Sequence, residues 1–87
     1  MISHTSAAFW VAYHALPPEV QAAARKAYRL FLADPHHPSL QFKKLLGTLY
    51  SVRVTKRYRG LGNREGDTIV WFWIGTHADY ERLIKSL

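Results

Sequence analysis

Hydrophobic residues recur with two different spacings along this chain, and the spacing changes between residues 35 and 50. Over residues 6–33 the apolar positions lie three or four residues apart, as they do on one face of an α-helix. From Tyr50 they alternate with polar positions, so that Tyr50 and Val52 point one way and Ser51 and Arg53 the other. The pattern predicts helices in the first part of the chain and an antiparallel sheet in the second.

Two helices are expected before residue 35. Thr5 or Ser6 can cap the first, because a side-chain oxygen there accepts a hydrogen bond from a free backbone N–H. It covers residues 6–15, and its inward face holds Phe9, Ala12, Tyr13 and Leu16, with Trp10 and His14 beside it. The second helix runs from Pro18, a residue suited to the first helical position, to Ala33 before Asp34-Pro35. Its inward stripe is Val20, Ala23, Ala24, Ala27, Leu30 and Phe31.

The second half predicts about four antiparallel strands. They are residues 40–45, a strand from Tyr50, a return strand through Arg59 and Leu61, and the apolar run Ile69–Ile74. Turns are expected at Gly47-Thr48, at Lys56-Arg57 and over Gly62–Asp67. The apolar run is expected to be a central strand covered on both sides, because both of its faces are hydrophobic. Residues 1–5 form at most an edge strand.

A short helix is expected at the end of the chain. Thr76 can cap it, with Asp79 three residues further on in a capping-box position. Its buried stripe would be Tyr80, Leu83, Ile84 and Leu87. The fold class is therefore α+β, with two N-terminal helices on a small twisted antiparallel sheet, and residues 1–87 form a single domain.

Charge is distributed unevenly along the chain. The net charge is +6, and the stretch from Pro35 to Arg64 contains seven basic residues and no acidic one. Such a block usually meets phosphates or an acidic partner, although a solvated face that only aids solubility is the alternative.

Several classes of protein are disfavoured by composition. The chain has no cysteine, so neither disulfides nor thiolate metal sites are possible. The adjacent His36 and His37 point in different directions, so we expect no metal site and no cofactor. No apolar run approaches the roughly 20 residues of a membrane span, and no signal peptide is evident, so a cytoplasmic protein is expected.

The register of the Tyr50 hairpin decides whether Arg53 and Arg59 act together. A three-residue bend places them opposite each other on one side of the sheet, whereas a two-residue bend moves Arg59 to the side of Val54. We expect the first arrangement, because an unpaired arginine buried beside Val54 is costly. Two guanidiniums that close repel each other unless an anion such as phosphate lies between them.

His77 follows the apolar strand and is the candidate for a general acid or base, because histidine titrates near neutrality. The alternative is a helix-start residue that makes only a local hydrogen bond. Further contacts to RNA or phosphate are expected from Lys43, Lys44, Lys56, Arg57 and Tyr80. Tyr80 could stack on a base, or it could simply pack in the core.

Four segments together resemble the toxins of the RelE/ParE superfamily, which belong to bacterial type II toxin–antitoxin modules. They are LPPEVQ, DPHHPSLQFKKL, YSVRVTKRYRGLG and WFWIGTHADYERLI, and the resemblance spans residues 9–84. It implies two helices over a twisted antiparallel sheet. Many members are ribonucleases that cut messenger RNA in the ribosomal A site, and the ParE branch inhibits DNA gyrase.

The resemblance also implies roles for individual residues. Arg59 matches the arginine that stabilises the phosphate, and His77 matches the catalytic histidine of some ribonuclease members. Arg53 and Lys43 or Lys44 would line the same basic face. Two features depart from the family's pattern. The segment SLQFKKL lacks the glutamate that some active members use as general base, and a helix follows His77 where active members often end.

Three functions stay open at this point. The first is a ribosome-dependent mRNA endoribonuclease with Arg59, His77 and Arg53 as catalytic residues. The second is a non-enzymatic toxin that blocks gyrase or another target by binding, and the third is a non-toxic basic nucleic-acid-binding module. The acid-free stretch from Pro35 to Arg64 and the small core predict an acidic antitoxin as partner, lying across the basic sheet face or the helices. We expect a monomer when the toxin is free, a hetero-oligomer when it is bound, and no membrane contact.

Overall fold

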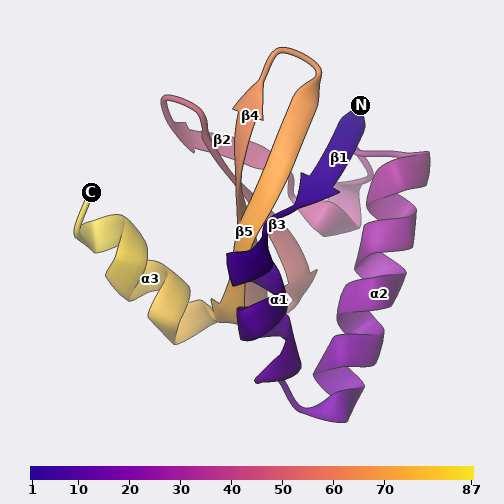
Figure 1. Cartoon of the computed structure of the whole chain (residues 1–87), viewed down its shortest axis with the longest axis vertical. Helices are drawn as coiled ribbons and strands as arrows, with labels where there is room; N and C mark the ends of the chain where they lie inside the picture. The colour runs from indigo at the N-terminus through magenta and orange to yellow at the C-terminus, as the bar shows by residue number, and fades with distance from the viewer.

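Three α-helices, one short 3₁₀ helix and five strands make up the chain, and the computed structural model describes residues 1–87 (Figure 1). In chain order the elements are β1 (Ile2–Thr5), α1 (Ala7–His14), α2 (Pro18–Ala33), η1 (Pro38–Leu40), β2 (Lys43–Leu46), β3 (Leu49–Thr55), β4 (Tyr58–Glu65), β5 (Thr68–Thr76) and α3 (His77–Lys85). This order confirms the predicted α+β class.

The sheet has five strands in the order β1-β5-β4-β3-β2, one more than expected. β1 pairs with β5 in parallel, so the sheet is mixed and not purely antiparallel. The extra strand is held by side chains remote in sequence: Ser3 Oγ lies 3.0 Å from Tyr28 Oη and accepts from Trp71 Nε1 at 3.1 Å. A segment of four residues is too short to show a periodicity that would predict this pairing.

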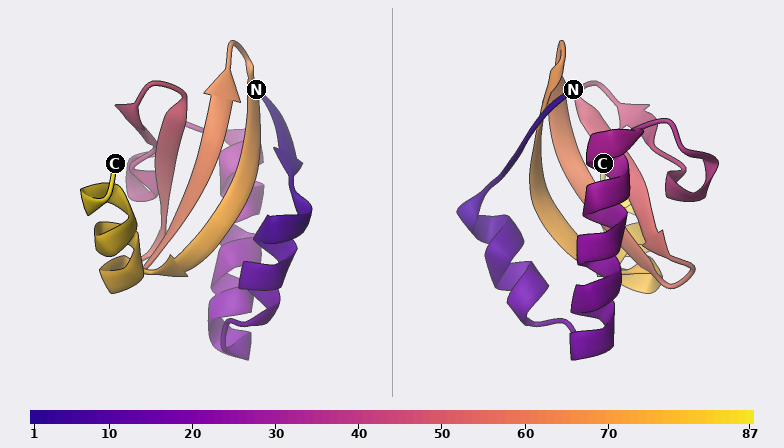
Figure 2. Two further views of the ribbon diagram at one scale, coloured as in Figure 1. Left: turned by 60° about the vertical axis from the view of Figure 1, so that its left-hand side comes forward. Right: turned by 90° about the vertical axis from the view of Figure 1, so that its right-hand side faces the viewer.

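Helices α1 and α2 lie on one side of the sheet, here called the helix face, and α3 lies on the other (Figure 2). Ser6 Oγ caps α1 by accepting from the Phe9 N–H at 3.3 Å, and Pro18 opens α2 as predicted. The predicted inward stripes of both helices meet the sheet. The buried core residues on this face are Tyr13, Leu16, Val20, Ala24, Phe31, Leu40, Val52, Ile69, Trp71 and Ile74.

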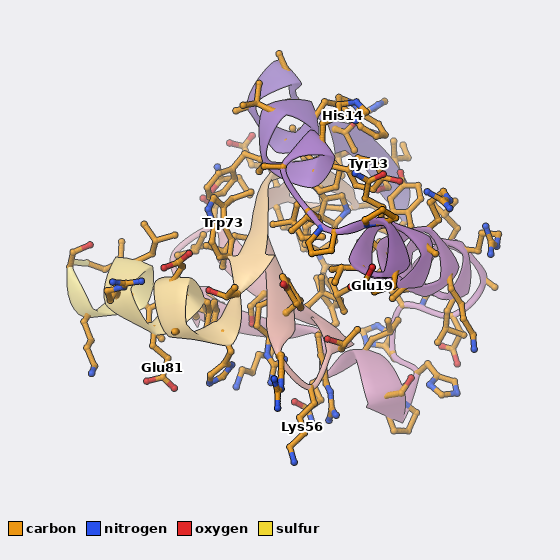
Figure 3. The ribbon with its side chains drawn as sticks, turned by 90° about the horizontal axis from the view of Figure 1, so that it is seen from below. Tyr13, His14, Glu19, Lys56, Trp73 and Glu81 are labelled. Atoms are coloured by element: carbon orange, nitrogen blue, oxygen red, sulfur yellow. The ribbon has the colours of Figure 1, made fainter.

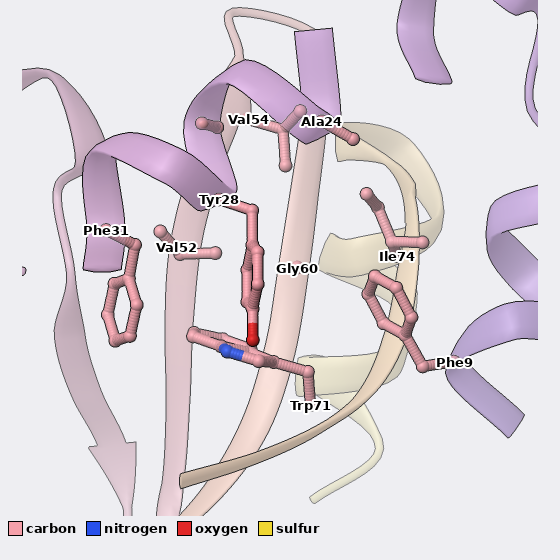
Figure 4. Close-up of a pocket in the computed structure, with 10 residues that line it drawn as sticks. Phe9, Ala24, Tyr28, Phe31, Val52, Val54, Gly60, Trp71 and Ile74 are labelled. Carbon is pink, nitrogen blue, oxygen red and sulfur yellow. The ribbon is translucent and has the colours of Figure 1, made fainter. Parts of the chain in front are cut away.

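A small apolar cavity of about 40 Å³ lies inside this core, between α2 and the sheet (Figure 4). Its walls include Phe9, Tyr28, Val52 and Trp71, and Gly60 forms part of its floor. A Cβ atom at Gly60 would lie 3.1 Å from Val52 Cγ1 on the neighbouring strand, so a larger residue fits there only if Val52 shifts.

The opposite side of the sheet carries Arg53, Arg59 and Trp73 and is here called the arginine face. Trp71 packs in the core of the helix face, whereas Trp73 lies on the arginine face, opposite Leu61. The ladder between β4 and β5 shifts register between Leu61 and Gly62, so Trp71 and Trp73 point to different sides. β5 is an interior strand, yet Val70 is 37% exposed, so its predicted cover on both sides is incomplete.

Two predicted boundaries in the sheet were wrong. The turn expected over Gly62–Asp67 is confined to Gly66-Asp67, because β4 continues to Glu65. Gly62 is a strand residue on which Trp71 packs: a Cβ there would lie 2.8 Å from the Trp71 ring. The strand expected over residues 40–45 begins only at Lys43, since Leu40 belongs to η1 and Gln41 has a left-handed backbone that breaks the extended chain.

The C-terminal helix begins as predicted, with Thr76 Oγ1 accepting from the Asp79 N–H at 3.1 Å. Its buried stripe is narrower than predicted. Tyr80 is buried, but Leu83 is 41% and Leu87 67% exposed. The helix contacts the sheet only near its first turns, so its end projects into solvent (Figure 1). None of the three helices has the length and apolar character needed to cross a membrane.

Candidate functional site

The pairing of β3 with β4 brings the two candidate arginines together. A two-residue turn joins the strands, and Thr55 pairs with Tyr58 directly beside it. The register then shifts at Val54, so that Arg53 lies opposite Arg59. Such an extra residue is a β-bulge, and it restores the alignment that a two-residue turn alone would prevent. The predicted facing of the arginines is confirmed, although the bulge and not a longer bend produces it.

The guanidinium of Arg59 is partly committed to the hairpin that carries it. Its Nη1 donates to the backbone carbonyl oxygens of Thr55 at 2.6 Å, Tyr58 at 3.1 Å and Lys56 at 3.3 Å. These bonds brace the turn from within. Nε and Nη2 donate to no protein atom, so one edge of the fork is free to bind an anion.

Electrostatics favour an anion at this position. The pKa of Arg59 lies below its ordinary value, mainly because the group is partly buried and also because Arg53 is close; the neighbouring Tyr80 acts in the opposite direction. Neither arginine has an ion pair: the three in the chain join Met1 to Asp67, His77 to Glu81 and Arg82 to Asp79. A bound phosphate would offset the repulsion between the two guanidiniums.

His77 is the first residue of α3 and lies beside this hairpin. Its backbone N–H donates to the carbonyl oxygen of Arg57 at 2.6 Å, which ties the helix start to the turn. Its Nε2 lies 2.8 Å from Glu81 Oε1, and since a carboxylate can only accept, Nε2 carries the proton. Its Nδ1 is buried without a hydrogen-bond partner. Nε2 is therefore the ring nitrogen that a ligand can reach.

Glu81 is the site residue that sequence reasoning missed. No carboxylate was expected near His77, because the resemblance places the family's glutamate in the segment that reads SLQFKKL here. The signal was present in the spacing, since residues four apart on a helix are neighbours. Both side chains are partly exposed, at 42% for His77 and 48% for Glu81, so the pair is open to solvent.

Tyr80 supports the site and does not present a stacking surface. It is 6% exposed, and its ring centroid lies 5.5 Å from that of His77. On the same face, Trp73 packs over Gly75, where a Cβ atom would lie 2.5 Å from the indole. Tyr80 is therefore packed in the protein, which was the alternative, and its ring is too buried to stack on a base.

The lysines expected at the site divide between the two faces of the sheet. Lys43 lies opposite Ser51 and so shares the side of Arg53, whereas Lys44 lies opposite Tyr50 on the other side. Lys56 and Arg57 form the exposed turn, and Lys56 points away from the helices (Figure 3). The basic residues gathered on the arginine face or at its edge are Lys43, Arg53, Lys56, Arg57 and Arg59.

The adjacent histidines act locally. His37 Nδ1 accepts from the Ser39 N–H at 3.2 Å and thereby caps η1. Elsewhere, no three His, Asp or Glu side chains lie close enough together to hold a metal ion. The side chains gathered at the hairpin offer fixed cations, in Arg53 and Arg59, and proton exchange, in His77 and Glu81.

Comparisons with known proteins agree with this fold. Residues 18–82 match the model of the ParE-like toxin domain family. A search of curated proteins finds no match. Among solved structures, the RelB–RelE antitoxin–toxin complex from Methanococcus jannaschii aligns with a TM-score of 0.72 and 16% identity, covering 92% of this chain and 96% of that one.

Two further structures share the fold. YafQ from E. coli aligns with a TM-score of 0.71 and 10% identity, covering 90% of this chain and 94% of its own. A YoeB/ParE toxin from Agrobacterium tumefaciens aligns at 0.67 and 15%, covering 88% and 99%. The family match extends from the start of α2 into α3 and includes the arginine pair and His77. The chain belongs to the ParE-like toxin domain family, within the RelE/ParE superfamily of type II toxin–antitoxin toxins.

Proposed function

We propose that this toxin is a ribosome-dependent endoribonuclease that cleaves messenger RNA and so stops translation. The facing pair of Arg53 and Arg59 carries the proposal. Two cations opposite each other, with no carboxylate between them, suit a phosphodiester, which accepts charge-assisted hydrogen bonds from both. The His77–Glu81 pair beside the same hairpin supplies groups that can move protons.

In the proposed reaction, the 2′-oxygen of the RNA bonds to the adjacent phosphorus while the bond from phosphorus to the 5′-oxygen breaks. One group must take the proton of the 2′-hydroxyl, and another must give a proton to the leaving 5′-oxygen. Doubly protonated His77 gives its Nε2 proton to the leaving 5′-oxygen, and Glu81 is placed to take the proton of the 2′-hydroxyl once its bond to His77 opens. Arg53 and the free edge of Arg59 hold the charge that develops on the phosphate oxygens. Lys43 adds a further cation on this face.

Induction of the toxin in bacteria, followed by primer extension on cellular transcripts, tests this proposal. We expect cuts in translated regions that disappear when translation initiation is blocked and that are much weaker for Arg53→Ala. His14→Gln, on exposed α1, is the control and should cut as the parent does. Growth arrest without any transcript cleavage would overturn the ribonuclease proposal.

A second function, inhibition of DNA gyrase by binding alone, is favoured by one observation. In the free protein Nε2 of His77 is hydrogen-bonded to Glu81 and Nδ1 is buried, so neither nitrogen is free to act on a substrate. A supercoiling assay with purified toxin and gyrase discriminates between the two. Gyrase inhibition without RNA cleavage would replace the first proposal by the second.

The proposed partner is an acidic cognate antitoxin, with the toxin monomeric when free and hetero-oligomeric when bound. The RelE structure from M. jannaschii was determined together with RelB, an antitoxin. The positive charge of this chain is the feature that an acidic partner would complement. We place the protein in the cytoplasm on this proposal, since ribosomes and gyrase are both found there.

A further inference from the structure

A recess lies at the edge of the sheet, where β3 passes α2 and η1. It has a volume of about 500 Å³, which is within the range of small-molecule sites in proteins. We call it the edge recess. It is lined by Ala23, Lys26, Ala27, Leu30, Ser39, Leu40, Arg53, Val54 and Thr55. Because Arg53 is one of these residues, the edge recess borders the pair of arginines.

The backbone of β3 is open along the edge recess. β2 pairs with β3 only at Leu49, Tyr50 and Ser51, so residues 52–55 have a neighbouring strand on one side only, that of β4. The free side of an edge strand presents N–H and C=O groups without a strand partner. The bulge at Val54 breaks their regular spacing, so an added peptide strand would find no regular ladder there. A ligand that needs only a few donors and acceptors suits this edge better.

The side chains of the edge recess combine apolar surface, hydroxyls and positive charge. The apolar part comes from α2, η1 and Val54, and Ser39 and Thr55 add hydroxyl groups. Lys26 is exposed and has no ion pair, and no acidic residue lines the recess. The lining therefore suits a ligand with an apolar body, hydrogen-bonding groups on its rim and a negative charge close by.

A nucleotide of single-stranded RNA has this combination of groups. The faces of its base are apolar, the edge of the base carries donors and acceptors, and a phosphate lies on each side along the strand. Proteins that recognise single-stranded RNA hydrogen-bond to the edges of unpaired bases, whereas contacts to phosphates fix position without reading sequence. The edge recess offers both kinds of contact beside Arg53.

We infer that the edge recess binds the base of the nucleotide that adjoins the scissile phosphate, and that Lys26 holds the next phosphate along the strand. The inference rests on the proposed function and deepens it, because it adds the selection of a base to the cleavage step. Arg53 and Arg59 hold the scissile phosphate whatever the sequence. The open backbone of β3 and the Thr55 hydroxyl distinguish one base from another.

The first test measures the affinity of the purified toxin for a labelled short single-stranded RNA at several salt concentrations. Lys26→Ala should weaken binding by about threefold to tenfold and lower the slope of log affinity against log salt by about 0.7, as the loss of one phosphate contact does. Arg29→Ala removes the same charge from the same helix, but Arg29 lines a separate groove beside Trp10 and Tyr13. It should leave both the affinity and the slope close to those of the parent.

The second test fills the edge recess without changing its charge. Ala23→Leu should weaken RNA binding by about tenfold or more, because the added carbons occupy the space of the base. It should also reduce the differences in affinity among RNAs that vary at that one base, and the differences in cleavage rate among codons on programmed ribosomes. Ala22→Leu adds the same side chain at an exposed position of α2 outside the recess and should behave as the parent. Melting temperatures show whether both variants are folded.

The outcomes separate the edge recess from the ribonuclease proposal. If Lys26→Ala and Ala23→Leu match the parent in affinity, salt slope and base preference, the recess is not an RNA site, and cleavage by the parent would still support the ribonuclease. If the parent does not cleave but binds RNA through the recess, the ribonuclease proposal fails and the RNA site stands. Weaker binding with an unchanged base preference would overturn the selection of a base. If Ala23→Leu loses a protein partner and keeps RNA, the recess binds protein instead.

Discussion

The two faces of the sheet differ in what their buried residues do. On the helix face, ten buried hydrophobic residues in two clusters pack against α1, α2 and η1. On the arginine face, the short helix α3 covers only part of the surface, and partly buried arginines lie beside Leu61 and Tyr80. The first arrangement maximises apolar contact, and the second leaves charge near the surface where a ligand can reach it. The comparison teaches that most of the buried apolar contact lies on one side of the sheet, whereas the cations proposed to bind phosphate lie on the other.

The largest expected effect is on activity, at His77. His77→Gln should lower ribosome-dependent cleavage by about 10²–10⁴-fold, because it removes the proton-transferring group. Its melting temperature should stay near that of the parent, since the pair with Glu81 is partly exposed and contributes little. The measurement is single-turnover cleavage on programmed ribosomes.

His14→Gln on α1 is the matched control and should leave cleavage unchanged. Full cleavage by His77→Gln would show that His77 only begins a helix. The arginine face would then have no proton-transferring histidine.

Next in size is a loss of stability on the helix face. Phe31→Ala should destabilise the fold by about 3–5 kcal/mol, because it empties a site where the ring is 2% exposed and packs edge-on against Trp71. Urea unfolding followed by tryptophan fluorescence measures it. Leu32→Ala, on the exposed neighbour, should change stability by less than about 0.5 kcal/mol. Similar effects of the two would contradict the assignment of the core.

Arg59 and Arg53 provide a sharper comparison within the arginine face. Arg59→Ala should reduce both cleavage and stability, the latter by about 1 kcal/mol, because three carbonyl oxygens of the hairpin lose their donor. Arg53→Ala should reduce cleavage alone, since Arg53 makes no hydrogen bond within the protein. Melting temperatures measured beside cleavage rates separate the two roles. Equal melting temperatures of the two variants would show that the hydrogen bonds of Arg59 do not stabilise the hairpin.

The smallest effect is expected on α3. Leu83→Ala should change stability by less than about 0.5 kcal/mol, because the side chain is 41% exposed. Leu61→Ala, from the buried centre of the same face, should lose about 2–5 kcal/mol. Urea titrations of both variants make the test. A large effect of Leu83→Ala would mean that α3 packs more closely on the sheet than its exposure indicates.

Much of the candidate site followed from the sequence. The alternation in β3 assigned Arg53 to the polar face, and the capping signal at Thr76 and Asp79 assigned His77 to a helix start. Glu81 was readable from its spacing and was overlooked. The free edge of Arg59 and the sealed Nδ1 of His77 were not predictable, because they depend on atoms of Thr55, Lys56 and Tyr58 and on the packing around α3.

The sequence by itself determined the local structure: where helices begin and end, which strand is most apolar, and that Gly66 lies in a turn. These features depend on neighbours within about four residues along the chain, so caps, prolines and periodicity suffice to predict them. Only the tertiary structure decided the bulge at Val54, the parallel pairing of β1 and the side on which Trp73 lies. Each of these depends on a register between remote segments. A shift of one residue moves every side chain to the other face, and the energy that selects one register comes from packing across the whole sheet.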